Sequence, residues 1–281
     1  MDPNVGSAPT VKSFDEMPTI SVPGDDRLEM PAFLAQMSIE HGPAFRRPTP
    51  PRQQQRFGSW LVHMVGPEAN RFVLQSHRDA FSHERGWTPS LGGRVEQGLL
   101  NTDGPLHDQA RKMMNPAFAV AYMQAYLPIM NRIVGECTGD WVERGAVDLW
   151  VETRRITFDV AAEALVGMQA GAEADRLRGL FFAIMHGQSP AALSREAHVA
   201  HITSLRGELD NLLLRAIAQR RAAPTDDILG LLTQARDEQG QPFSDKQLLG
   251  HVHILLLAGH ETTTTLSAWL LYLLATHPDY L

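Results

Sequence analysis

Residues 254–275 place the strongest constraint on the fold, because this long apolar stretch needs either a protein core or a lipid bilayer around it. Its centre carries Glu261 and four consecutive threonines that begin at Thr262. A charged side chain at the middle of a bilayer costs about 2.5–3.5 kcal/mol, and the apolar runs on either side are too short to span. The sequence therefore predicts a long core helix over 244–276.

The centre of this helix has an unusual composition. Ala258 and Gly259 remove side-chain bulk where another group could lie close to the backbone. A buried Glu261 needs a partner or a function, and Thr262 places an alcohol beside it. The pattern predicts an opening flanked by an acid and an alcohol. The alternative is a bent core helix whose threonine hydroxyls bond to the preceding turn.

Charge and cysteine content exclude several classes of protein. The net charge is −7 and the pI is about 5.9, which argues against binding to nucleic acid. Cys137 is the only cysteine, so no disulfide can form within the chain and a reducing compartment fits. Residues 1–9 lack a basic segment followed by an apolar one. We therefore expect a soluble, cytoplasmic chain without a membrane anchor.

Hydrophobic spacing predicts a mainly α fold with a small N-terminal β-sheet. We expect an arm over 1–26, a helix over 30–41, two paired strands at 44–47 and 59–65, and a loop over 86–101. A further short strand is expected at 147–150. The remaining pattern is helical, and the expected helices cover 106–114, 118–140, 150–167, 172–186, 194–222, 225–236 and 244–276.

Two sets of residues could bind a ligand. His107 and Arg111 are four residues apart and share a helix face, so together they could hold an anionic group. An ordinary exposed pair is the alternative. His253 and His260 also share a face, and with Glu261 they could form a metal site. No zinc-type spacing of histidines supports that second hypothesis.

Taken in order, several segments resemble those of a bacterial-type cytochrome P450. The similarity covers residues 27–281 and is carried by segments 42–45, 66–74, 81–82, 103–118, 226–232, 243–248, 258–263 and 277–278. The resemblance implies a haem-thiolate fold. It also implies a monooxygenase that inserts one atom of O2 into a small, apolar organic substrate. Electrons from NAD(P)H would arrive through a ferredoxin- or flavodoxin-type partner.

The resemblance also implies roles for individual residues. His107 and Arg111 match positions that bind the haem propionates, and Ala258 and Gly259 match the oxygen groove. Glu261 and Thr262 match the acid–alcohol pair that helps to deliver protons. The resemblance further implies substrate contacts at four positions, which are Leu99, Leu100, Leu255 and Thr263.

Other features of the family are missing from the sequence. After the long helix at 244–276 the sequence has neither a Glu-x-x-Arg helix nor a Phe-Gly-x-Gly-x-Arg-x-Cys loop, and the surroundings of Cys137 do not match that loop. Residues 268–275 are apolar on every side and should be enclosed by other elements. We therefore expect 27–281 to be the N-terminal part of an incomplete P450 domain, inactive alone and without a metal ligand. The alternative function is a non-catalytic helical module that binds small molecules.

Overall fold

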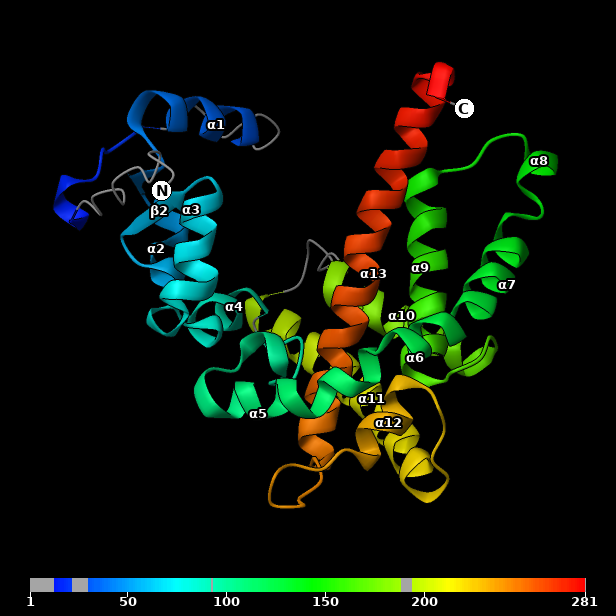
Figure 1. The fold of residues 1–281 in the computed structure, drawn as a ribbon. Coiled ribbons are helices and arrows are strands. Elements are labelled where there is room, and N and C mark those ends of the chain that lie inside the picture. Colours follow the sequence, from blue (N-terminus) through cyan, green and yellow to red (C-terminus); the bar gives the residue numbers. More distant parts are fainter. Residues whose placement is uncertain (1–12, 22–29, 92, 188–193, 281) are drawn as a thin grey trace, which may run out of the picture. The chain divides into compact units, whose positions relative to one another are not determined.

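The computed structural model describes residues 13–21, 30–91, 93–187 and 194–280. Most of the expected arm over 1–26 lies outside these residues. The chain divides into two compact units, Met1–Ser82 and His83–Leu281, and each is described by itself (Figure 1).

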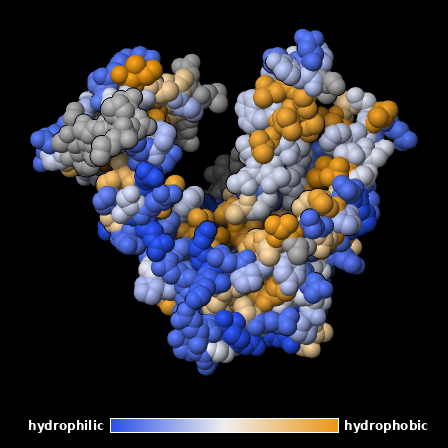
Figure 2. Space-filling model, viewed as in Figure 1, coloured by the Kyte–Doolittle hydropathy of each residue, from blue (hydrophilic) through white to orange (hydrophobic). Residues whose placement is uncertain are grey.

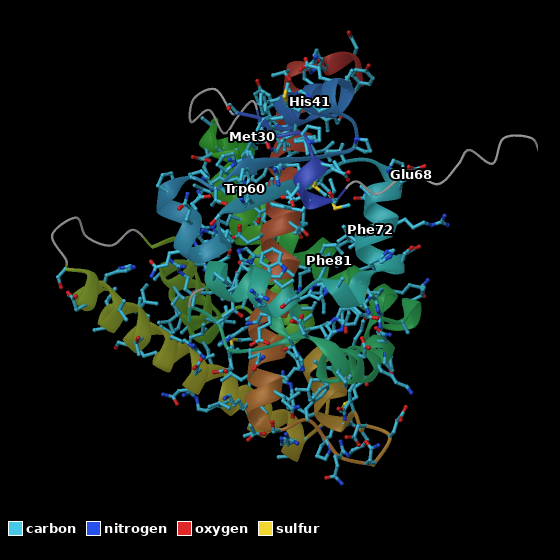
Figure 3. The ribbon with its side chains drawn as sticks, turned by 90° about the vertical axis from the view of Figure 1, so that its left-hand side faces the viewer. Met30, His41, Trp60, Glu68, Phe72 and Phe81 are labelled. Carbon is cyan, nitrogen blue, oxygen red and sulfur yellow. The ribbon has the colours of Figure 1, made fainter. Side chains whose placement is uncertain are left out.

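The first unit contains the expected hairpin. Strands β1 (Ala44–Pro48) and β2 (Trp60–Met64) pair antiparallel, and a helix, α2 (Pro51–Phe57), occupies the connection, where the sequence pattern predicted none. Helix α1 (Met30–His41) ends at Gly42, as predicted, and α3 (Pro67–Arg71) opens with a proline. Figure 3 shows the ends of α1, and Trp60 at the start of β2.

The second unit is helical. Its elements in chain order are α4 (His83–Leu91), η4 (Leu99–Asn101), α5 (Gly104–Met114), η5 (Asn115–Phe118), α6 (Val120–Ala125), α7 (Leu127–Thr138), α8 (Trp141–Arg144), α9 (Leu149–Val166), α10 (Ala172–His186), α11 (Arg195–Ala222), α12 (Ile228–Gln234) and α13 (Asp245–Thr276). Within the described ranges the sheet of the first unit is the only one, so the mainly α prediction is confirmed.

Local capping explains where helices α9 and α13 begin. Asp148 accepts hydrogen bonds from the backbone N–H groups of Trp150 and Val151 and so starts α9. Ser244 and Gln247 form a reciprocal capping box at the start of α13. These two helices pack along one another more extensively than any other pair of elements in the described chain (Figure 1).

The core of the second unit lies between α9, α10, α11, α12 and α13. Its largest fully buried side chains include Phe158, Phe181, Leu213, Leu229 and Leu248. Burying an apolar side chain of this size contributes about 1.5–3 kcal/mol relative to leaving it exposed. The hydrophobic effect on these faces therefore fixes the helix arrangement that positions α13.

Three predictions of local structure were wrong. Residues 147–150 are not a strand, because Asp148 caps α9 and the helix starts at Leu149. The first residues of the expected loop over 86–101 belong to helix α4 instead. A distant residue stabilises this helix, because the Asp103 carboxylate accepts hydrogen bonds from the N–H groups of His83 and Glu84. The single helix expected over 118–140 is divided into η5, α6 and α7, with Pro128 in the first turn of α7.

Glycine is required where the loop before η4 crosses α13. A Cβ atom at Gly250 would lie 1.8 Å from the carbonyl oxygen of Gln97, and one at Gly98 would lie 2.4 Å from the carbonyl oxygen of Gly250. No side chain fits at this distance, so the two glycines allow backbone to lie against backbone. The close approach anchors η4 to the first half of α13.

None of the helices in the described ranges is both long enough and apolar enough to cross a membrane.

Candidate functional site

One face of α13 is uncovered in the second unit from its middle to its C-terminal end. Ala258 and Thr262 begin this face, and Leu266, Trp269 and Leu273 continue it at helical spacing. Trp269 is 60% exposed, so the enclosure expected for 268–275 is not found within the described residues. Figure 2 shows hydrophobic side chains gathered over this end of α13.

The threonine hydroxyls mostly satisfy themselves, as one of the two hypotheses predicted. Thr262 Oγ1 donates to the Ala258 carbonyl at 2.7 Å, and Thr263 Oγ1 donates to that of Gly259 at 3.1 Å. The hydroxyl of Thr264 instead bonds to that of Thr157 on α9 at 2.6 Å, in a buried position. Thr262 therefore keeps free acceptor lone pairs on the exposed face.

Gly259 differs from Ala258 in its surroundings. A Cβ atom at Gly259 would lie 3.3 Å from Leu165 Cδ1 and 3.8 Å from Ala161 Cβ, both on α9. The absence of a side chain there brings α9 and α13 together. Ala258 lies on the exposed face beside Thr262 and supplies the small surface that the sequence predicts.

Glu261 has two histidine partners. Its Oε1 lies 2.5 Å from His186 Nε2, at the last residue of α10, and 2.9 Å from His260 Nε2. The Glu261 side chain is 27% exposed, which leaves it half-buried. The carboxylate therefore has the partner that a half-buried acid requires.

His260 is fully buried among aromatic rings. Phe158, Phe181 and Phe182 each lie within 5.6 Å of its ring, centroid to centroid. Burial is the largest cause that lowers the pKa of His260, against the raising effects of the Leu256 carbonyl and of Glu261. The surroundings thus favour the neutral ring.

Helix α5 presents the second pair of predicted residues. Arg111 is exposed, and its guanidinium makes no hydrogen bond or ion pair with any residue of the described ranges. His107 lies one turn away, stacked on His83 with ring centroids 5.5 Å apart, and its Nδ1 is 3.1 Å from Asp108 Oδ1. The pair combines an exposed guanidinium with a half-buried imidazole, and Asp108 competes for one histidine nitrogen.

The predicted substrate contacts fall into two groups. Leu100 packs on Leu91, Val95 and Ile254, a small cluster between the η4 region and α13. Leu99 and Leu255 are partly buried against the main core instead. Thr263 is exposed on α13.

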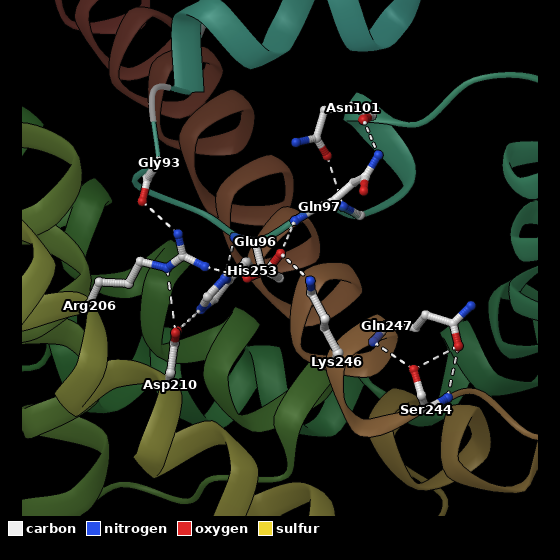
Figure 4. A network of polar contacts seen from close by, with 11 residues as sticks. Gly93, Glu96, Gln97, Asn101, Arg206, Asp210, Ser244, Lys246, Gln247 and His253 are labelled. Carbon is white, nitrogen blue, oxygen red and sulfur yellow. Dashed lines mark hydrogen bonds and ion pairs between the residues drawn. The ribbon is translucent and has the colours of Figure 1, made fainter.

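A partly buried polar network fixes the loop that leads to η4 (Figure 4). Arg206 on α11 donates to the Gly93 carbonyl at 2.7 Å and to Glu96 Oε2 at 2.6 Å. His253 accepts from the Glu96 N–H at its Nδ1, so its hydrogen is on Nε2, which lies 3.1 Å from Asp210 Oδ1 without hydrogen-bond alignment. The hypothesis of a metal site containing His253 is therefore wrong, because this ring belongs to the loop network.

Cys137 lies away from both candidate groups. It is buried on α7 and lines a pocket with residues of α7, α9 and α10, among them Asp159 and Arg178. Burial is the largest cause that raises the pKa of its thiol. A buried, protonated thiol does not favour metal ligation, in agreement with the sequence.

A family model described as Cytochrome P450 matches residues 56–281. The chain belongs to the cytochrome P450 family. A putative cytochrome P450 136 of Mycobacterium tuberculosis is 28% identical over 226 residues, which are 78% of this chain and 46% of that protein. A putative cytochrome P450 120 of Synechocystis is 29% identical, over 79% of this chain and 50% of that protein. The chain thus spans about half the length of these curated relatives.

Solved structures of cytochromes P450 are also similar to this chain. The retinoic acid-bound cyanobacterial CYP120A1 aligns with a TM-score of 0.66 and 27% identity, covering 90% of this chain and 57% of that one. The mixed-function P450 MycG aligns with a TM-score of 0.73 and 26% identity, covering 94% and 64%. The prediction of a partial P450 fold is therefore confirmed.

His186 is the main site residue that the sequence did not reveal. It stands 75 residues before Glu261, at the end of a helix, in no recognisable motif. Only the packing of α10 against the core brings it to α13. Arg154, whose guanidinium lies 4.0 Å from the Phe182 ring centroid, was missed for the same reason.

Proposed function

We propose that this chain supplies the oxygen-side wall and the propionate-binding helix of a haem-dependent monooxygenase. Family membership implies the haem cofactor. The observation that carries the proposal is the free guanidinium of Arg111 beside His107 on an exposed helix face. Arg111 has no anionic partner among the described residues, although Asp108 lies 3.1 Å from His107 Nδ1, and such a guanidinium fits the carboxylate of a haem.

The residues present fit a haem on chemical grounds. Arg111 and His107 would hold the propionates, and Ala258 leaves space beside Thr262 on the exposed face of α13. When bound, the haem supplies the activation of O2. Cys137 would not serve as its thiolate ligand, because it is buried among α7, α9 and α10.

Glu261 and Thr262 would bind and transfer protons. The Thr262 hydroxyl, which now donates to the Ala258 carbonyl, can accept a hydrogen bond at its free lone pairs. The Glu261 carboxylate can hold a proton shared with His186, whose ring is partly exposed and in reach of solvent. Solvent, His186 and Glu261 together form a route for protons to this part of α13.

We further propose a small, apolar organic substrate. Leu100 and the exposed Thr263 would contact it, with Leu99 and Leu255 supporting the wall from the core side. The structural relative CYP120A1 is described with retinoic acid, a largely apolar molecule. Electrons from NAD(P)H would come through a ferredoxin- or flavodoxin-type protein, since the sequence has no flavin or iron–sulfur motif.

A haem titration of the 281-residue chain tests the proposal. Arg111→Ala should weaken haem binding by about 10–100-fold, since a hydrogen bond to a charged group contributes about 1.5–3 kcal/mol. The measurement is the Soret absorbance as haem is added. Lys112→Ala is the matched control, because it removes the same charge from the next residue, which pairs with Glu238. Equal affinity for both variants would contradict the proposed role of Arg111.

A further inference from the structure

Three potential ligand atoms converge where the end of α10 meets the middle of α13. They are His186 Nε2, His260 Nε2 and a carboxylate oxygen of Glu261, and all lie within 4.8 Å of one another. The two nitrogens approach the same oxygen, Glu261 Oε1, at 2.5 and 2.9 Å. No proposed role in haem binding requires this convergence.

The hydrogen-bonding state of His260 leaves its inner nitrogen without a partner. Its Nδ1 lies 2.8 Å from the Leu256 carbonyl oxygen, which can only accept, so Nδ1 carries the hydrogen. In the neutral ring Nε2 then has a lone pair, and it is fully buried without a hydrogen bond. Glu261 Oε1 lies 2.9 Å from Nε2 without the alignment of a hydrogen bond, so a cation bound by both atoms would give the buried nitrogen a partner.

The carbonyl contact also resembles the support that metal-binding histidines receive. Such rings commonly donate their other N–H group to a carbonyl or carboxylate, which fixes the tautomer and the ring orientation. The three phenylalanine rings around His260 hold it further. Burial lowers the pKa of His260, so the alternative of a protonated ring between Nε2 and Glu261 is disfavoured.

We propose that His186, His260 and Glu261 form a binding site for a divalent transition metal of the Zn2+ type. Two imidazoles and one carboxylate are a known zinc ligand set, with a water in the fourth position. Ligand atoms of a tetrahedral zinc site lie about 3.3 Å apart, so the two nitrogen–oxygen separations need to open by less than about 1 Å. The two nitrogens already lie within 4.8 Å of each other. His186 is partly exposed and provides the entry path.

Charges around the site are compatible with one such ion. Glu261 supplies one negative charge, and Arg154 supplies a positive charge near enough to act on both Glu261 and His260. The Arg154 guanidinium is held over the Phe182 ring, which accommodates a cation. A metal ion would occupy the Glu261 carboxylate and so compete with its proposed role in proton handling.

Metal binding to the 281-residue chain tests this site without haem or activity. Zn2+ alone is titrated by calorimetry at neutral pH, and bound metal is counted after dialysis. We expect one ion per chain. His186→Ala and Glu261→Gln should each weaken binding by more than the roughly 10–100-fold that losing an outer partner costs. Bound Co2+ should give the intense visible bands of a four-coordinate site.

The control variant is His201→Ala, which removes an exposed histidine on α11 outside the cluster. Its zinc affinity should equal that of the unaltered chain. Circular dichroism of each variant confirms that it folds, and neither His186 nor Glu261 is fully buried. The proposal is overturned if no stoichiometric zinc binds, or if His186→Ala binds it as tightly as His201→Ala does.

Discussion

At the scale of single residues, His251 is a buried histidine without a charged partner. Its ring packs on Phe243 with centroids 4.9 Å apart, and its Nδ1 has no hydrogen bond. Burial lowers its pKa from 6.5 to about 4. The neutral ring is therefore stable in the fold, and protonation favours the unfolded chain.

This pKa predicts a loss of stability in acid. The contribution of His251 is fully present above pH 6.5, falls as the pH drops below that unfolded-state value, and is gone near pH 4. At about 1.36 kcal/mol per pH unit, the loss amounts to about 3 kcal/mol. The free energy of unfolding in urea, measured at pH 7, 6, 5 and 4, should fall less for His251→Leu than for the unaltered chain. Parallel curves for His251→Leu and the unaltered chain would contradict this account, and His201→Ala should behave as unaltered.

At the scale of elements, the crossing of the Gln97–Gly98 backbone over α13 depends on Gly250. We predict that Gly250→Ala destabilises the fold by about 1–3 kcal/mol, because a Cβ atom would overlap the Gln97 carbonyl. This loss should appear in spite of the higher helix propensity of alanine. The measurement is the free energy of unfolding in urea.

Gly207 is the matched control, because it lies inside α11 and a Cβ atom added there would meet nothing within 4 Å. Gly207→Ala should stabilise the chain by up to about 1 kcal/mol. If both alanine variants are stabilising, the loop does not lie against α13 as described.

The sequence predicted elements well where their signals are local. The expected helix over 244–276 is observed as Asp245–Thr276, because Ser244 and Gln247 cap it within one turn. The strand pair is also observed at the expected positions, although helix α2 occupies the long connection between the strands. One error came from a long-range effect, since Asp103 caps α4 from twenty residues away. The errors at 147–150 and 118–140 overlooked the local signals of Asp148 and Pro128.

The site was predicted in the same uneven way. His107, Arg111, Ala258 and Thr262 could be proposed from the sequence because each belongs to a motif within one helix. The partners of Glu261 could not, since His186 reaches it only through the packing of α10. Helical spacing alone also could not show that Glu96 and Asp210 lie beside the ring of His253.

At the scale of the whole molecule, the second unit leaves one apolar face of α13 uncovered. The face begins at Ala258 and Thr262 and continues through Leu266, Trp269 and Leu273. Its apolar half also lines a hollow with Trp150 of α9. Because the proposed oxygen-side residues begin this face, we expect haem to lie against α13 at Thr262.

The position of bound haem relative to Thr262 tests this expectation most directly. A nitroxide is attached at Thr262→Cys in a Cys137→Ser background, and a second label at Glu143→Cys on α8 serves as the control. We predict that ferric haem shortens the relaxation time of the label at 262 much more than that at 143, while diamagnetic zinc protoporphyrin changes neither. If haem binds and the label at 262 relaxes no faster than the label at 143, haem does not lie against this face of α13.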